Sequence, residues 1–140
     1  MTREQGDPLV PSGLDSALLG RLTTRSAAAG AREVAELAQE AVGHLDEIRR
    51  AAASNPFVNV RLAEAICDRL QAVASGWRHV PEHARPWLKG AMAYFVQGDD
   101  ELPDDQSPIG FEDDCEVMNA CLRLAGREDL CLAPEDFDEY

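Results

Sequence analysis

The stretch YFVQGDDELPDDQSPIGFEDD, residues 94–114, decides how this chain is organised. An apolar run with helical spacing stops at Gly98, a loop broken by proline and glycine follows, and a new helix is expected from about Asp113. The loop carries many carboxylates, which repel one another unless helix ends, basic side chains or a bound cation organise them. These acidic residues are Asp99, Asp100, Glu101, Asp104, Asp105, Glu112, Asp113 and Asp114.

Four segments around this loop have the apolar spacing of helices, and none alternates as a strand does. The predicted helices span residues 31–53, 56–75, 86–98 and 113–125. The third is apolar almost all round, which is typical of a helix at the centre of a bundle. We therefore predict an all-α fold, either a small four- to five-helix bundle or an orthogonal array, with a flexible N-terminus and an acidic C-terminal tail. The first helix has a narrow, alanine-rich apolar seam of Val34, Ala38, Ala41, Leu45, Ile48 and Ala52.

The length and composition fit one domain with tails. The chain has 140 residues, and 45% of them are hydrophobic, enough to form a core. Residues 1–30 are predicted to be a flexible segment with one short helix capped by Asp15, in which residues 23–30 form a linker or a frayed end. Residues 31–126 are the predicted helical domain, and residues 127–140 are the acidic tail. The tail has three apolar residues able to dock, Leu130, Leu132 and Phe137.

The charge of the chain restricts its partners. The formal net charge is −13, from 26 acidic and 13 basic residues. Nucleic acid and anionic membrane surfaces are therefore disfavoured, because both require a basic footprint. No stretch approaches the roughly 18 apolar residues of a membrane span, and the N-terminus lacks a signal-peptide pattern, so we predict a cytoplasmic location without membrane insertion. The negative electrostatic field of the chain would attract a basic protein or a divalent cation, although acidic surfaces also keep proteins soluble without any binding role.

The usual catalytic and metal-binding motifs are missing from the sequence. The four cysteines form no CxxC pair, and their spacing resembles no disulfide framework. His79 and His83 are separated by Pro81, which breaks the geometry of a helical metal-binding pair. There is no GxSxG motif and no glycine-rich phosphate loop. These observations favour a non-catalytic protein.

The acidic stretch also contains residues at a characteristic spacing, in which a tyrosine is followed by Asp, Pro-Asp, Gly and Asp-Asp. In this pattern the chain resembles the YkvA-type family of small helical domains, over about a quarter of its length from near Lys89 to about Asn119. The resemblance implies a helical domain without an agreed biochemical function and supplies no established catalytic residue. The matching residues are Tyr94, Asp100, Pro103, Asp104, Gly110, Asp113 and Asp114.

This chain departs from the family pattern at three positions. Asp99 and Glu101 stand where the family usually has apolar residues, and Gly98 stands where it usually has proline. Members of the family often lie at or in membranes. The more polar loop of this chain argues against such a role.

Two arrangements of the aspartates remain open. Asp100, Asp104, Asp113 and Asp114 are candidate ligands for Ca²⁺ or Mg²⁺ if the loop folds so that both helix ends meet, although their spacing is not that of a calcium loop. Alternatively they are structural, capping turns and the start of the last helix or pairing with Arg85 or Lys89. The structural arrangement is favoured, and no cofactor is expected.

The predicted function is a cytoplasmic interaction or regulatory module that presents an acidic loop and tail to a protein partner. A divalent-metal-binding protein or metal-dependent enzyme built on the Asp cluster is the alternative. A homodimer through the alanine-rich seam of the first long helix is also compatible with the pattern. The candidate partner-binding residues are Asp99, Glu101, Asp105, Glu135, Asp136 and Asp138.

Overall fold

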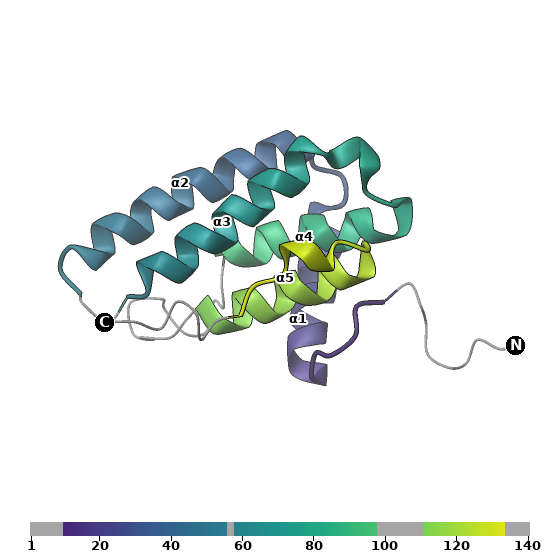
Figure 1. Cartoon of the computed structure of the whole chain (residues 1–140), viewed down its shortest axis with the longest axis horizontal. Helices are drawn as coiled ribbons and strands as arrows, with labels where there is room; N and C mark the ends of the chain where they lie inside the picture. The colour runs from purple at the N-terminus through teal and green to yellow at the C-terminus, as the bar shows by residue number, and fades with distance from the viewer. Residues whose placement is uncertain (1–9, 56–57, 98–110, 134–140) are drawn as a thin grey trace, which may run out of the picture.

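The part of the chain that the structure describes folds into five α-helices (Figure 1). A computed structural model describes residues 10–55, 58–97 and 111–133, and no strand occurs among them, which confirms the all-α prediction. The helices are α1 (Ser16–Ala29), α2 (Val34–Ala52), α3 (Val60–Ser75), α4 (Arg85–Gln97) and α5 (Phe111–Leu124). Short 3-10 turns in the described ranges include η1 (Trp77–His79), η2 (Glu82–Ala84) and η4 (Glu128–Leu130).

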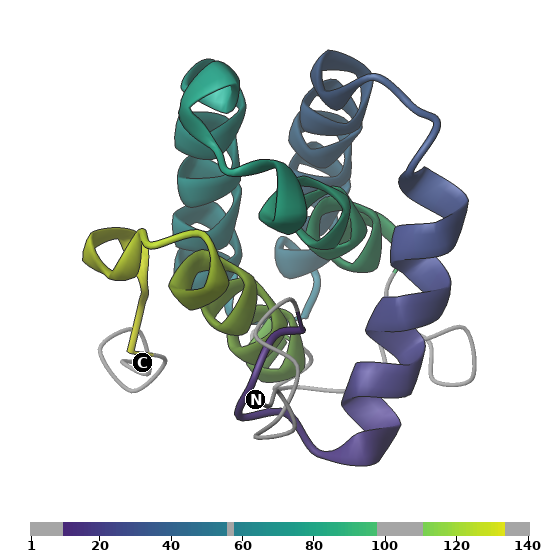
Figure 2. The same ribbon diagram turned by 90° about the vertical axis from the view of Figure 1, so that its right-hand side faces the viewer.

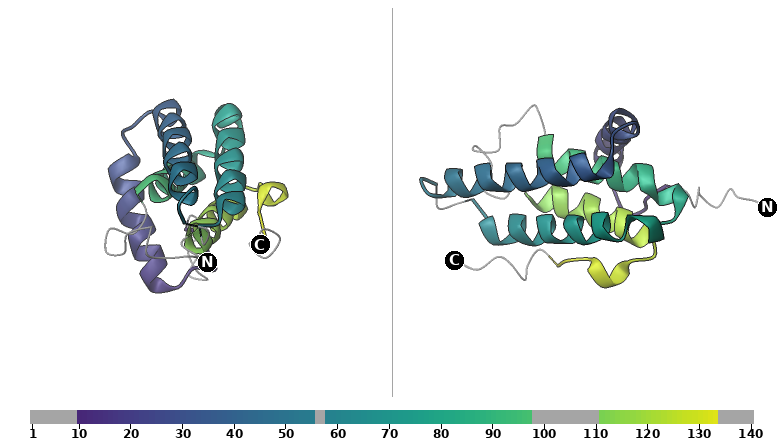
Figure 3. Two further views of the ribbon diagram at one scale, coloured as in Figure 1. Left: turned by 90° about the vertical axis from the view of Figure 1, so that its left-hand side faces the viewer. Right: turned by 90° about the horizontal axis from the view of Figure 1, so that it is seen from above.

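Helices α2 to α5 run along the long axis of the molecule, whereas α1 runs across them (Figures 1 and 3). α2 and α3 form an antiparallel pair. At one end the Gln71 amide donates to the Ala38 carbonyl at 2.9 Å, and at the other Arg49 pairs with Glu64 at 3.0 Å. The fold therefore combines features of a bundle and of an orthogonal array, the two alternatives predicted.

Helix α4 is the central helix, as its apolar sequence predicts. It packs against α1, α2 and α5 (Figure 2). Its buried side chains lie on all of its sides, which leaves no face for solvent along most of its length. These side chains belong to Leu88, Ala91, Met92, Ala93, Tyr94 and Phe95.

The predicted linker at residues 23–30 is wrong, because α1 continues without a break to Ala29. Asp15 caps this helix as predicted, and its Oδ1 accepts from the Leu18 amide at 2.8 Å. The hydroxyl of Thr23 bonds back to the Leu19 carbonyl at 2.7 Å, so a residue of low helix propensity is accommodated. Packing of the apolar face then stabilises the helix, since Leu22 and Ala29 are buried in the same core as the other four helices.

The small residues of α1 allow a close crossing with α4. Ser26 is buried and faces Gly90, where a Cβ atom would lie 2.0 Å from the Ser26 Oγ and 2.9 Å from the Ser26 Cα. No side chain fits between the two helices at this point. The two backbones touch because both residues are small.

The remaining helices begin and end within a few residues of the predicted limits. α2 begins at Val34 rather than residue 31, and its core face includes Leu37, which the narrow predicted seam omitted. The face is wider because α2 packs against both α3 and α4. α3 begins only at Val60, after the Asn59 side chain caps it by accepting from the Leu62 amide at 3.1 Å.

Helix α5 begins at Phe111, two residues before the predicted start, and ends in a left-handed turn. Gly126 has φ +78°, and the Arg127 amide donates to the Leu122 carbonyl at 2.8 Å. This turn is the glycine-dependent helix stop that the sequence predicts. It sends the chain back along α5 in the opposite direction.

The segment after this turn, residues 127–133, packs on the domain, and we call it the strap. Leu132 is buried and joins the core, and Leu130 and Cys131 pack against it. The Asn119 amide bonds both main-chain groups of Leu132, donating to its carbonyl at 2.7 Å and accepting from its N–H at 2.9 Å. The docking predicted for Leu130 and Leu132 is therefore confirmed, and Phe137 lies outside the described residues.

Candidate functional site

The structure describes three of the predicted site residues, Tyr94, Asp113 and Asp114. Asp113 is exposed in the first turn of α5, where a carboxylate interacts favourably with the helix dipole. Asp114, the next residue, is only 7% exposed. The other predicted residues lie outside the described part of the chain: Asp99, Asp100, Glu101, Pro103, Asp104, Asp105, Gly110, Glu135, Asp136 and Asp138.

Tyr94 accepts a hydrogen bond from Arg21 and lies close enough to Asp114 to interact with its charge. Tyr94 is 3% exposed, and burial of its hydroxyl raises its pKa above the ordinary value. The negative charges of Asp114 and Asp113 raise this pKa further, whereas a hydrogen bond from Arg21 opposes the rise. Tyr94 on α4 thus interacts with Arg21 on α1 and with Asp114 on α5.

Sequence reasoning did not find Arg21. It lies far from the acidic stretch along the chain, in a helix that was predicted to be a short element of a flexible segment. The available signal was its position three residues after the core residue Leu18, because a residue at that spacing borders the buried face of a helix. Only the crossing of α1 over α4 brings it to Tyr94.

The two basic residues predicted to pair with the Asp cluster make other contacts. The Arg85 Nε donates to the Val80 carbonyl at 3.1 Å, and its guanidinium lies 5.9 Å from the centre of the Trp77 ring. Lys89 donates through Nζ to the Gly30 carbonyl at 3.2 Å, which closes the end of α1. Both residues therefore stabilise helix connections.

The metal-binding alternative finds no support in the described residues. No group of three or more His, Cys, Asp or Glu side chains in residues 10–55, 58–97 and 111–133 is arranged to hold a metal ion. Asp100 and Asp104, two of the four proposed ligands, are outside these ranges.

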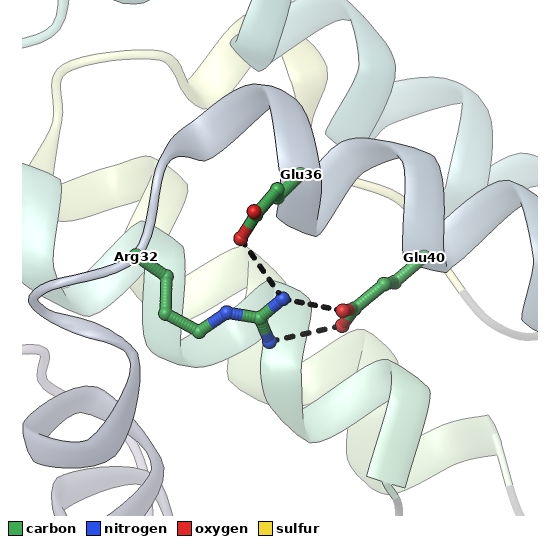
Figure 4. Close-up of polar contacts among 3 residues, drawn as sticks. All are labelled: Arg32, Glu36 and Glu40. Atoms are coloured by element: carbon green, nitrogen blue, oxygen red, sulfur yellow. Dashed lines mark hydrogen bonds and ion pairs between the residues drawn. The ribbon is translucent and has the colours of Figure 1, made fainter.

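An ion-pair cluster at the start of α2 is structural (Figure 4). Arg32 precedes α2 and pairs with both Glu36 and Glu40 on its first turns, with Arg32 Nη2 3.2 Å from Glu36 Oε1. The hydrogen bond from Arg32 lowers the pKa of Glu40. All three side chains are partly or largely exposed, so the cluster contributes little to stability and serves to fix the start of α2.

The four thiols are poorly suited to nucleophilic chemistry. Burial raises the pKa of Cys115 to about 12 and also raises the pKa of Cys67, Cys121 and Cys131. A raised pKa keeps a thiol protonated at neutral pH, whereas the thiolate is the nucleophile.

An outer groove of about 480 Å³ lies between α2 and α3. None of its lining residues carries a charge. The lining residue Gln71 on α3 donates a hydrogen bond to the Ala38 carbonyl on α2. Within the described part of the chain, no helix has both the length and the apolar content needed to cross a membrane.

No protein-family model, curated protein or solved structure matches this chain.

Asp114→Ala is expected to lower the free energy of unfolding by about 1–3 kcal/mol, because it removes a buried carboxylate from a polar cluster. The same change is expected to lower the pKa of Tyr94, since a negative charge that disfavours the phenolate is lost. Urea unfolding and an ultraviolet titration of tyrosine measure the two effects. Asp113→Ala, one residue away and exposed, is the control and should change stability by less than about 0.5 kcal/mol. Equal losses from both substitutions would contradict a buried role for Asp114.

Proposed function

We propose that the protein is a non-catalytic cytoplasmic interaction module that presents acidic segments to a basic partner. The observation that carries this proposal is the division of charge along the chain. Residues 1–97 contain eleven acidic and eleven basic residues, whereas residues 98–140 contain fifteen acidic and two basic residues. The entire formal charge of −13 therefore belongs to the second part.

This division has a physical consequence for recognition. The potential of an acidic segment attracts a basic partner and accelerates its association, and the effect weakens as salt shortens the screening length. The neutral first part contributes no net attraction of its own. It supplies most of the helical core, including helices α1 to α4.

The described residues support a binding function over a catalytic one. Tyr94 and Asp114 are buried and interact with each other, and the partly exposed Arg21 bonds Tyr94, which suits a structural role. The exposed acidic residues of the second part, by contrast, include Asp113 and Glu116 on α5. The family resemblance belongs to this proposal too, since the first and last residues of the motif, Tyr94 and Asp114, interact within the fold.

The proposal is tested by binding to a lysine-rich peptide at increasing salt. A triple variant, Glu135→Gln, Asp136→Asn and Asp138→Asn, removes three charges from the acidic tail. It is expected to weaken binding by roughly threefold or more at low salt, because three exposed ion pairs of about 0.2–1 kcal/mol each are lost. This difference should shrink at 0.5 M salt because the charges are then screened.

The matched control removes three charges from the neutral part of the chain. Glu33, Glu47 and Glu82 are exposed, and their replacement by glutamine changes the net charge by the same amount. It should leave the affinity nearly unchanged. If both triple variants lose the same affinity, total charge alone drives binding and the acidic segments are not the recognition surface. If the wild-type protein does not bind the peptide, the proposed function is wrong.

A further inference from the structure

The strap, residues 127–133, is held on the surfaces of α3 and α5 through its main chain. Asn119 on α5 bonds both the N–H and the carbonyl of Leu132, at 2.9 and 2.7 Å. Arg69 on α3 donates through Nε to the Leu130 carbonyl at 3.1 Å. The Cys115 thiol adds a weaker contact to the Leu132 carbonyl at 3.8 Å. We call Arg69, Cys115 and Asn119 together the strap site.

Side chains of the strap add to this contact, since Leu130 and Cys131 are partly buried against the core. Leu132 is 8% exposed and packs into the core. Glu128 and Asp129 are exposed, and Asp129 pairs with Arg127 within the strap itself at 3.0 Å. The strap therefore meets the domain as a short 3-10 turn, Glu128–Leu130, followed by an extended end from Cys131, with Leu132 as its one buried side chain. Much of this contact uses main-chain groups, and a contact of this kind tolerates many sequences.

The strap is also lightly attached to the rest of the molecule. It is joined to α5 through Gly126, which is exposed and has a left-handed backbone. Opening the strap separates it from Asn119 and Arg69 and exposes Leu132, while the five helices keep their own contacts. Segments with few buried contacts open at a free energy well below that of global unfolding.

We propose that the strap site is a peptide-binding site that the strap occupies in the free protein. The partner that fits it is a segment of another protein that follows the same path as the strap, a short turn and then extended backbone, with a leucine-like side chain at the place of Leu132. This inference rests on the proposed function, because it adds a second contact to the same interaction module. It differs in chemistry, since binding at the strap site pairs uncharged main-chain groups and changes little with salt.

Because the strap is covalently joined to α5, it competes strongly with an external peptide for the strap site. A segment on a short flexible connection has an effective concentration in the millimolar range, so an external peptide binds weakly until the strap is loosened. A change that weakens the strap without altering the strap site should therefore increase the affinity for an external peptide. If the strap residues themselves bound the external peptide, the same change would lower the affinity instead.

The test uses the full chain and a capped peptide with the sequence of residues 127–133, in which serine replaces Cys131. The variant Leu132→Ser loosens the strap and is expected to bind this peptide about tenfold or more tightly than the wild-type protein. Adding Asn119→Ala to Leu132→Ser should abolish binding. A peptide with serine also at the place of Leu132 should not bind to any variant. Isothermal titration calorimetry at two salt concentrations measures all of these affinities.

A second measurement uses the unaltered protein. The Leu132 amide donates to Asn119 and should exchange its hydrogen through local opening, faster than the buried amides of α5. Exchange of this amide only at the rate of global unfolding would overturn the proposal, as would failure of the peptide to bind folded Leu132→Ser. Binding of the lysine-rich peptide by the wild-type protein would still support the proposed function in either case, so the two failures are distinguishable.

Discussion

Gly90→Ala is expected to lower the free energy of unfolding by about 3 kcal/mol, near the upper end of the range for overpacked cores. The added methyl group would lie 2.0 Å from the Ser26 Oγ and 2.9 Å from the Ser26 Cα. Rotation of the serine side chain relieves the first contact but not the second, which involves the backbone of α1. The two helices must therefore separate, and the better helix propensity of alanine, worth about 1 kcal/mol, does not offset this.

Gly43→Ala is the matched control, because Gly43 is also inside a helix but exposed, and a Cβ atom there meets nothing within 4 Å. This substitution is expected to increase stability by about 0.5–1 kcal/mol, so the two glycines should give effects of opposite sign. Urea unfolding measures both. Adding Ser26→Gly to Gly90→Ala should recover part of the loss, since it shortens the opposing side chain. Similar effects at Gly90 and Gly43 would mean that α1 and α4 do not cross at this point.

A chain that ends after Gly126 is expected to be about 3 kcal/mol less stable than a chain that ends after Ala133. The first truncation removes the strap and with it a buried leucine, worth about 1.5–3 kcal/mol, and the main-chain bonds made by Asn119. It also leaves Cys115, fully buried in the intact protein, beside a new opening. Thermal and urea unfolding of the two truncated chains compare these contributions.

This result matters for any study of the acidic tail. The sequence predicts an acidic tail after Gly126, and because Leu132 is buried we expect the removal of residues 127–133 to destabilise the fold. A deletion that tests the role of charge must keep residues 127–133. A chain ending at Gly126 with unchanged stability would show that the strap does not pack as described.

The sequence predicts well those features that depend on neighbouring residues. Helix α4 is predicted to be central because nearly all of its side chains are apolar, and the cap at Asp15 and the stop at Gly126 follow from local turn chemistry. Helix α1 is predicted only in part. Its second half consists of small and polar residues, and its burial depends on Gly90, a residue from a different predicted element.

The same distinction explains the candidate site. The motif includes Tyr94 and Asp114, which the fold places together. Arg21 and Asn119 belong to no motif and acquire their roles only through tertiary contacts. The sequence around a single arginine or asparagine on a helix does not indicate which residue it will contact. Such residues become visible only when the crossing of the helices and the direction of the strap are known.

The crossing of α1 over α4 also affects the order in which the protein assembles as it is synthesised. Ser26 leaves the ribosome long before Gly90, so α1 has no partner while α2 and α3 emerge and pair as neighbours in sequence. During that interval Leu18 and Leu22 have no core to enter, although both are buried in the finished protein. The nascent chain therefore exposes an apolar helix until α4 is complete, which makes this interval the stage at which chaperone binding or misassembly is most expected.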